Sequence, residues 1–338
     1  MTEIAGRAII VAAVGVVSVA GVVFAATRSG GGSGPDAAAA DRWLPLASSP
    51  LMRTEVTAAR IGRRIYVIGG FDESTGQTTS AVARYDIARD AWTRDAWTRV
   101  SPLPIAVNHA TATSYRGKVY VHGGFTDLGG LDDATARLYS YNPDRDRWKR
   151  LADSEVPRAA HALGEIDGRL LAAGGANSSS DRLTSLEIYN VSKRRWSSGP
   201  ALSVGRNHVA GAVREDRFYV LGGRPGNLDV VEVYEPKRRR WSEAAPLNTP
   251  RSGFAAVVVR GRIVAFGGEE SGGTIAPVEL YHPDADRWTA LPEMRTPRHG
   301  LGGAARKGRV FALEGGPQPG FAFSNAVEFL DVPRNPAR

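Results

Sequence analysis

Five arginines of this sequence occur in one repeated context, and arginine is a side chain well suited to holding an anion. Each stands just before a segment of small residues: Arg53, Arg158, Arg206, Arg251 and Arg298. A sixth segment of the same kind has Val107 in the arginine's place. A guanidinium group can meet two oxygens of a carboxylate or phosphate at once. We therefore predict that these arginines bind an anionic ligand. The alternative is that they hydrogen-bond the carbonyl groups of a loop in the next repeat.

Histidines lie close to these arginines in the sequence. His109 and His208 follow the arginine position of their segments, His161 and His299 are nearby, and Glu55 occupies a corresponding position. Histidine exchanges a proton near neutral pH, so such a group suits acid–base work on a bound ligand. A histidine pair can equally serve as a hydrogen-bonding surface. We predict His109 and His208 as binding residues and assign no catalytic residue.

The remaining composition excludes several kinds of chemistry. The sequence contains no cysteine, which excludes disulfides, thiolate metal ligands and a cysteine nucleophile. It shows no phosphate-binding loop, dinucleotide fingerprint, zinc motif or hydrolase motif, so we predict no cofactor and no metal. The formal net charge of +8 favours contact with something anionic, or simply reflects a solvated arginine-rich surface. Nucleic acid is not an expected partner, because no aromatic platform for stacking bases is evident.

The candidate residues belong to a pattern that repeats six times after residue 40. Each repeat has a short apolar run ending in Gly-Gly, at Gly70, Gly124, Gly175, Gly223, Gly268 and Gly316. In five repeats a Tyr and a Trp follow at a fixed spacing: Tyr85/Trp92, Tyr141/Trp148, Tyr189/Trp196, Tyr234/Trp241 and Tyr281/Trp288. Short apolar runs between turn residues are typical of strands. Each repeat therefore predicts four strands, and the whole chain predicts an all-β fold.

The repeated apolar run, Gly-Gly doublet and Tyr–Trp pair resemble the Kelch repeat family over residues 41–333. The resemblance implies a six-bladed β-propeller with four-stranded blades. It also implies that the five arginines lie at the mouth of a central channel, where Kelch proteins commonly bind ligands and peptide segments. Some Kelch propellers are enzymes. Those of the copper radical oxidase type need a cysteine that this chain lacks, whereas a sugar-modifying activity of the sialic-acid mutarotase type stays open for His109, His208 and Glu55.

The last repeat lacks a tryptophan, and the segment after residue 40 supplies one. Phe329 takes the tyrosine position of that repeat, and the sequence around Trp43 matches the sequence around Trp288. We therefore predict that the N-terminal strand completes the last blade and closes the ring, which removes open sheet edges. A tandem duplication in the first repeat leaves open whether Trp92 or Trp97 packs in its blade.

The N-terminal region has a different composition from the repeats. Residues 8–27 carry no charge and are rich in Val, Ala and Ile, and about 20 helical residues span the ~30 Å core of a bilayer. We predict a short tail over residues 1–7, a transmembrane helix over 8–27 acting as a signal anchor, a Gly/Ser/Ala-rich linker over 28–40, and a C-terminal tail over 334–338. A cleaved signal peptide is the alternative. If the helix is retained, the chain is a single-pass membrane protein with its propeller on the extracytoplasmic side.

The turns divide by charge. Turns between the first and second strands, such as residues 260–262, are basic, whereas the loops that follow Gly-Gly lean acidic, as at Asp72 and Glu73. The basic turns add a second possible contact with a membrane. Together these features predict a membrane-tethered Kelch-repeat binding or scaffold protein. Its mouth would receive an anionic small molecule, a polymer or a protein partner.

Overall fold

The computed structural model describes residues 42–89, 96–128 and 132–334. The chain divides into two units, Met1–Gly34 and Pro35–Arg338, and all of the described residues belong to the second. The predicted membrane helix over residues 8–27 and the predicted linker lie outside these ranges. Within them, no helix has the length and apolar character needed to cross a membrane.

The described residues form six four-stranded antiparallel sheets. Sheet 1 contains β3 (Thr57–Ile61), β4 (Arg64–Ile68), β7 (Val82–Asp86) and β8 (Trp97–Val100). Sheet 2 contains β9 (Thr111–Tyr115), β10 (Lys118–His122), β11 (Leu138–Asn142) and β12 (Arg147–Arg150). Sheet 3 contains β13 (Ala162–Ile166), β14 (Arg169–Ala173), β15 (Leu186–Asn190) and β16 (Arg195–Ser198). Sheet 4 contains β17 (Ala210–Arg214), β18 (Arg217–Leu221), β19 (Val231–Glu235) and β20 (Arg240–Ala244).

The last two sheets follow the same plan, with one exchange of strands. Sheet 5 contains β21 (Ala255–Val259), β22 (Arg262–Phe266), β25 (Val278–His282) and β26 (Arg287–Leu291). Sheet 6 contains β27 (Gly302–Arg306), β28 (Arg309–Leu313) and β29 (Val327–Asp331), and its fourth strand is β1 (Leu44–Pro45) from the start of the described chain. Short strands in the loops form two further small sheets: β2 (Arg53–Thr54) with β5 (Phe71–Asp72) and β6 (Gln77–Thr78), and β23 (Glu269–Glu270) with β24 (Gly273–Thr274).

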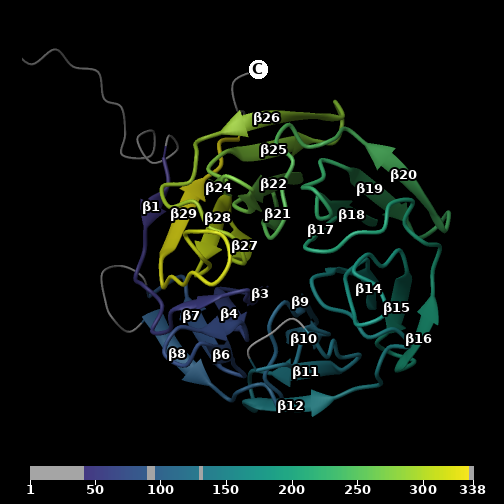
Figure 1. The fold of residues 1–338 in the computed structure, drawn as a ribbon, viewed down its shortest axis with the longest axis horizontal. Helices are drawn as coiled ribbons and strands as arrows, with labels where there is room; N and C mark the ends of the chain where they lie inside the picture. The colour runs from purple at the N-terminus through teal and green to yellow at the C-terminus, as the bar shows by residue number, and fades with distance from the viewer. Residues whose placement is uncertain (1–41, 90–95, 129–131, 335–338) are drawn as a thin grey trace, which may run out of the picture. The chain divides into compact units, whose positions relative to one another are not determined.

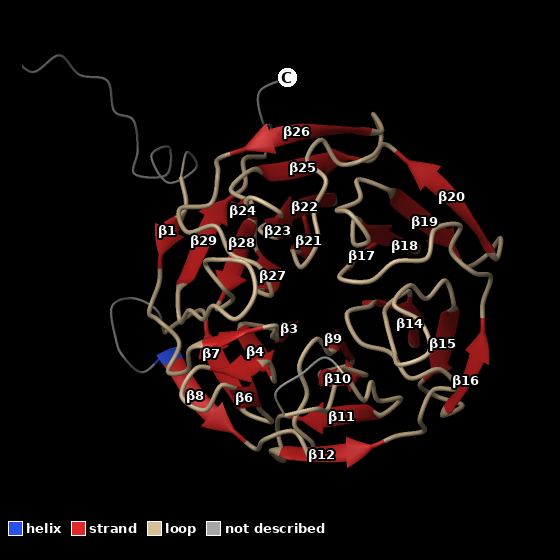
Figure 2. Ribbon diagram, in the orientation of Figure 1, coloured by secondary structure: helices blue, strands red, loops and turns tan. Residues whose placement is uncertain are grey.

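The sheets follow one another around an axis, with their first strands innermost (Figure 1). Strands β3, β9, β13, β17, β21 and β27 are neighbours in that order, and β27 is also a neighbour of β3. Strands and loops account for nearly all of the described residues (Figure 2). The small side chains of the first strands suit this position, because the strands crowd together near the axis. The all-β, propeller-like arrangement of repeated four-stranded sheets is therefore confirmed.

Four of the five residues in the second strand of each sheet are buried, which explains its continuous apolar run. In β4 the residues after Arg64 are all buried, whereas most of the fourth strand β12 is exposed. The Gly-Gly doublet that follows β4 is required by close packing. Gly69 and Gly70 have φ of 65° and 93°, and a Cβ on either would collide with the carbonyl oxygens of Val107 and Thr54, respectively. Glycine is the residue that tolerates both demands.

The outer tryptophans link each sheet to the preceding one by a recurring hydrogen bond. Each indole Nε1 donates to the carbonyl oxygen of the residue four positions after the preceding sheet's tryptophan. The donor and acceptor pairs are Trp97–Ala47, Trp148–Ser101, Trp196–Ala152, Trp241–Pro200, Trp288–Ala245 and Trp43–Pro292, at 2.8–2.9 Å. Trp43 therefore behaves as the tryptophan of sheet 6, next to sheet 5.

Two details of the tryptophan positions depend on the register of the strands. Trp97 pairs with Tyr85 across β7 and β8, and their ring centroids lie 5.0 Å apart, so Trp97 is the tryptophan that packs in sheet 1. Trp92 lies outside the described residues. In sheet 6, Leu44 pairs with Phe329, which puts Leu330 opposite Trp43. The prediction that Phe329 takes the tyrosine position is therefore wrong by one residue.

Candidate functional site

Six corresponding loop residues surround the axis where the first strands begin, and we call them the mouth ring. They are Glu55, His109, Ala160, His208, Gly253 and Gly300, and all six have a left-handed backbone with φ between 51° and 63°. Backbone hydrogen bonds join neighbours in this ring: His109 N donates to Glu55 O at 3.1 Å, and Gly253 N donates to His208 O at 3.0 Å. A left-handed backbone is unfavourable for residues with a Cβ and persists only where the surrounding structure enforces it. The ring backbone is thus fixed independently of side-chain type.

The five predicted arginines stand two residues before mouth-ring positions, and they are fully buried. Each one is paired with a buried glutamate. The pairs are Arg53–Glu314 at 2.7 Å, Arg158–Glu187 at 2.8 Å, Arg251–Glu279 at 2.6 Å, Arg298–Glu328 at 3.1 Å, and Arg206–Glu232. The prediction that these arginines offer open guanidinium groups at the mouth is therefore wrong. The carboxylate that each one needs comes from the protein itself.

Arg158 shows what these pairs do. Its Nη1 donates to the carbonyl oxygens of Gly174 and Ser185 at 2.8 and 3.0 Å, while its Nη2 donates to Glu187. Burial lowers the pKa of Arg158, and the charge of Glu187 raises it, so the guanidinium stays protonated as arginines do in proteins. Glu187 in turn accepts hydrogen bonds from the backbone N of Glu155 and Val156. The pair therefore ties loops around the mouth to the third strand. The carbonyl groups that Arg158 contacts belong to its own sheet, not to the next one as the alternative interpretation expected.

The exceptions among the repeats show that the pairing is specific. Sheet 2 lacks both partners, with Val107 in the arginine position and Tyr139 in the glutamate position. Sheet 1 has an arginine but carries Ala83 in the glutamate position. Arg53 instead takes Glu314, an additional residue before the Gly-Gly of sheet 6. A glutamate two residues before Tyr189, Tyr234 and Tyr281 is the sequence signal that would have identified these partners.

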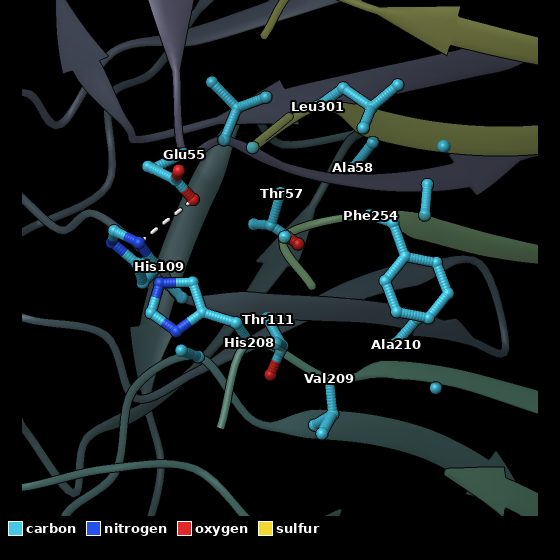
Figure 3. A pocket seen from close by; sticks show the side chains of 18 of the residues that line it. Glu55, Thr57, Ala58, His109, Thr111, His208, Val209, Ala210, Phe254 and Leu301 are labelled. Atoms are coloured by element: carbon cyan, nitrogen blue, oxygen red, sulfur yellow. Dashed lines mark ion pairs between the residues drawn. The ribbon is translucent and has the colours of Figure 1, made fainter. Parts of the chain in front are cut away.

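Three side chains of the mouth ring converge on a cavity of about 160 Å³ along the axis. His109 Nε2 lies 3.0 Å from Glu55 Oε2, and the rings of His109 and His208 meet edge to face with centroids 4.8 Å apart. Figure 3 shows these polar residues at one side of the cavity, with Phe254 and Leu301 at the other. Of the residues predicted from the sequence, His109 and His208 thus lie in the cavity wall and the arginines lie behind it.

The two histidines are oriented from behind by asparagines. His109 Nδ1 lies 2.6 Å from Asn108 Oδ1, and His208 Nδ1 makes the same contact with Asn207. Burial lowers the pKa of His109, partly opposed by the charge of Glu55, and burial lowers the pKa of His208 further below its ordinary value. Burial therefore favours the neutral imidazole at both positions. For His208, Nδ1 donates to Asn207 and the other ring nitrogen can accept a hydrogen bond, whereas His109 has an acceptor oxygen beside each ring nitrogen, so its contact with Glu55 needs a shared proton.

The polar network continues away from Glu55 through residues that the sequence analysis did not connect. His299 Nε2 lies 3.4 Å from Glu55 Oε1 and 3.9 Å from Glu269 Oε2, and Glu269 is paired with Arg224. Arg224 is partly exposed in the loop after Gly223. Nothing in the spacing of these residues indicated the contact, because they come from three different repeats. Across the described ranges, no cluster of His, Asp and Glu has the arrangement of a metal site.

These features define a protein of repeated four-stranded sheets arranged around an axis, with an Arg–Glu pair behind most mouth-ring residues. The KLHDC2/KLHL20/DRC7 Kelch-repeats domain family matches residues 42–223, and the Kelch motif matches residues 205–248 and 250–295. The chain therefore belongs to the Kelch repeat family.

Known proteins similar to this chain carry Kelch repeats as part of longer sequences. Kelch-like protein terF of Aspergillus terreus is 32% identical over 197 residues, which cover 53% of this chain and 41% of that protein. Kelch repeat and BTB domain-containing protein 1 of cowpox virus is 28% identical over 178 residues, covering 50% of this chain and 30% of that protein. The chain thus spans less than half the length of either relative.

A solved structure supports the fold. The structure of YjhT aligns with a TM-score of 0.69 at 18% identity, covering 84% of this chain and 96% of that chain. Similarity at this level of identity concerns the architecture.

Proposed function

We propose that this chain is a Kelch-repeat binding protein that receives a protein partner at the mouth ring. The supporting observation is that the six mouth-ring residues vary in type although their backbones are alike, and that Glu55, His109 and His208 converge on the axial cavity. Residues that hold the sheets together recur from sheet to sheet, as the tryptophans and the Arg–Glu pairs do. Loops held by a rigid scaffold are where binding residues usually occur, and Kelch domains in general mediate protein–protein interactions.

The proposal does not retain an anionic ligand bound by the five arginines. That expectation depended on unpaired positive charge near the axis, and each arginine has a carboxylate within 3.1 Å. A buried guanidinium already paired in this way has no charge left to attract an external anion.

A photo-crosslinking amino acid introduced at position 208 of the full chain tests the proposal in cells that produce the protein. We expect a discrete crosslinked partner from position 208 and none from the matched position 237, which is exposed in a turn between the third and fourth strands. A partner captured equally from both positions, or from position 237 alone, would contradict binding at the mouth.

A second candidate function is a sugar-modifying activity of the sialic-acid mutarotase type. The observation that favours it is the 3.0 Å contact of His109 with Glu55 beside the cavity. A neutral imidazole next to a carboxylate can pass a proton to or from a sugar hydroxyl group. The test follows anomer exchange of sialic acid by NMR. Acceleration by the parent chain that is lost in Glu55→Gln supports this activity, and no acceleration by the parent excludes it.

We also propose that residues 8–27 hold the chain in a membrane with the repeats on the extracytoplasmic side, and that the basic turns contact anionic headgroups. The uncharged composition of residues 8–27 and the net charge of +8 support this proposal. Protease treatment of intact cells tests the orientation, because repeats on the outer side are digested while the cytoplasm stays sealed. If the chain is recovered from the soluble fraction after lysis, the tether is absent.

We further propose that the six sheets constitute a complete six-bladed propeller that is closed by β1. The pairing of Leu44 with Phe329 and the hydrogen bond from Trp43 to Pro292 support closure by this strand.

A further inference from the structure

One part of the mouth-side loops is apolar and exposed, and it lies beside sheets 6, 1 and 2. Among the residues that the structure describes, the exposed large hydrophobic side chains are Met52, Leu128 and Phe321, at 40%, 56% and 59% exposure. Met52 precedes β2, Leu128 is in the loop after Gly124, and Phe321 is in the loop after Gly316. All three therefore lie on the side of the sheets to which the Gly-Gly doublets lead.

Each of these residues contacts the β5–β6 hairpin of the first repeat. The Phe321 ring lies 4.8 Å from the Phe71 ring, which is itself buried in β5. Glu73 N donates to Met52 O at 2.9 Å at the end of β5, and Thr78 N donates to Leu128 O at 2.7 Å from β6. We call Met52, Leu128 and Phe321 the apolar patch. The Phe71 ring also meets His109 edge to face at 6.3 Å, so the patch reaches the mouth ring.

Acidic side chains accompany the apolar patch. Glu73, Asp132 and Asp133 are exposed. Within the described part of the chain, none of these three has a basic nitrogen within ion-pair distance. The loop over residues 317–326 carries no charge. These acidic side chains give the loops after Gly-Gly in sheets 1 and 2 the sign opposite to the net charge of +8 of the whole chain.

Exposed apolar side chains grouped together mark interaction surfaces, and the charge around them selects the partner. We infer that the apolar patch binds a protein segment that carries large apolar side chains next to lysine or arginine. The inference rests on the proposed function, since it specifies the chemistry of the partner received beside the mouth. An anionic membrane or an acidic peptide would be repelled by Glu73, Asp132 and Asp133.

The test uses the full chain in detergent and two panels of fluorescent twelve-residue peptides, measured by anisotropy. Both panels place Leu and Phe at varied positions; one adds Lys and Arg, and the matched one adds Asp and Glu. We expect the apolar–basic panel to contain peptides bound at least tenfold more tightly than any apolar–acidic peptide. Equal binding of the two panels, or preference for the acidic one, would overturn the inference.

Variants locate the binding. Phe321→Ser together with Leu128→Ser should weaken the selected peptide at least tenfold, while Phe321→Leu should retain it. Replacing Glu73, Asp132 and Asp133 by Lys should remove the preference for basic peptides. Asp181→Lys, an exposed mouth-side change in the loop of sheet 3, should alter affinity less than twofold. Binding that all these variants leave intact would place the peptide elsewhere and refute the inference.

Sedimentation of the parent chain and crosslinking from position 208 distinguish the apolar patch from a self-association surface and from the mouth ring. If the parent chain self-associates and the Phe321→Ser/Leu128→Ser variant does not, the patch binds a second copy and the inference is wrong. If crosslinking from position 208 captures a partner that the patch variants bind normally, the proposed function stands and only this inference fails. If the peptide binds at the patch but position 208 captures nothing, the mouth ring is not the contact and the proposed function fails.

Discussion

The outer strands and the mouth ring of this protein repeat in different ways. At the outer strands, six tryptophans make the same hydrogen bond to the preceding sheet. Behind the mouth ring, five of the six repeats carry a buried arginine with a glutamate partner. At the mouth ring, six residues share one backbone conformation but are Glu, His, Ala, His, Gly and Gly. The difference teaches that residues recurring from sheet to sheet within this chain hold the sheets together. The residues that vary at a fixed backbone position are the candidates for binding.

Loss of β1 should have the largest effect of any change considered. A chain beginning at Leu51 lacks Trp43, which is buried at 2% exposure and packs against Phe266. Removing a buried tryptophan costs about 3–5 kcal/mol of unfolding free energy, and sheet 6 also loses its fourth strand. Urea unfolding measures the loss, with a chain beginning at residue 41 as the matched control. Equal midpoints for the two chains would show that β1 does not close the ring.

Breaking an Arg–Glu pair should have the next largest effect. Arg206→Met leaves Glu232 buried without its partner, which costs about 3–5 kcal/mol of unfolding free energy. Adding Glu232→Met should recover part of that loss, because an apolar pair replaces an unpaired charge, as Val107 and Tyr139 do in sheet 2. A double-mutant cycle measures the coupling. Full stability in the Arg206→Met variant, with loss of partner binding alone, would restore the binding interpretation of the arginines.

The pH dependence of the unfolding free energy should reveal the contribution of a buried histidine outside the mouth ring. Burial and, secondarily, Arg158 lower the pKa of His122 to about 3, and its ring contacts His161 Nε2 and Ser154 Oγ at 3.0 Å. The unfolded chain binds this proton near pH 6.5, so stability is highest above that pH. It should fall as the pH drops from 6.5 towards 3, by up to about 1.4 kcal/mol per pH unit.

The His122→Gln variant isolates this contribution. Its unfolding free energy should fall less steeply between pH 6.5 and 4 than that of the parent chain. His282→Gln, at a partly buried histidine that contacts Thr289, is the comparison variant. Burial lowers the pKa of His282 too, but by less than that of His122, so this variant's slope should stay closer to the parent's. Parallel slopes for the parent and His122→Gln would show that His122 accepts a proton in the folded state.

Changing the mouth ring itself should have the smallest effect on stability. His208→Gly removes the contact with Asn207 but relieves a left-handed backbone at φ 51°, as Gly253 and Gly300 do at the same position. Since the two effects oppose each other, we expect a change within about 1 kcal/mol and a loss of partner binding. A loss of stability comparable to that of Arg206→Met would mean that the mouth ring, too, is primarily structural.

Much of the fold could be predicted from the sequence because its determinants are local. An apolar run has to be buried, and the backbone turns where a Gly-Gly doublet follows it. The spacing of these features therefore located the strands and the repeats. The pairing of Trp97 with Tyr85 was left open, because two copies of one segment satisfy different spacings equally well. The register of Leu330 opposite Trp43 was missed because it depends on which residues of two distant strands meet.

The candidate site divides in the same way. The sequence by itself determined the six repeats, the recurring arginines and the histidines near the axis, since these are fixed by residue type and spacing. Only the tertiary structure decided that each arginine is neutralised by a glutamate, and in the case of Arg53 by Glu314 of the last sheet. It also decided that Met52, Leu128 and Phe321 all contact the β5–β6 hairpin. The energy of a charge or an apolar side chain depends on what surrounds it, and those neighbours come from other repeats that folding brings close.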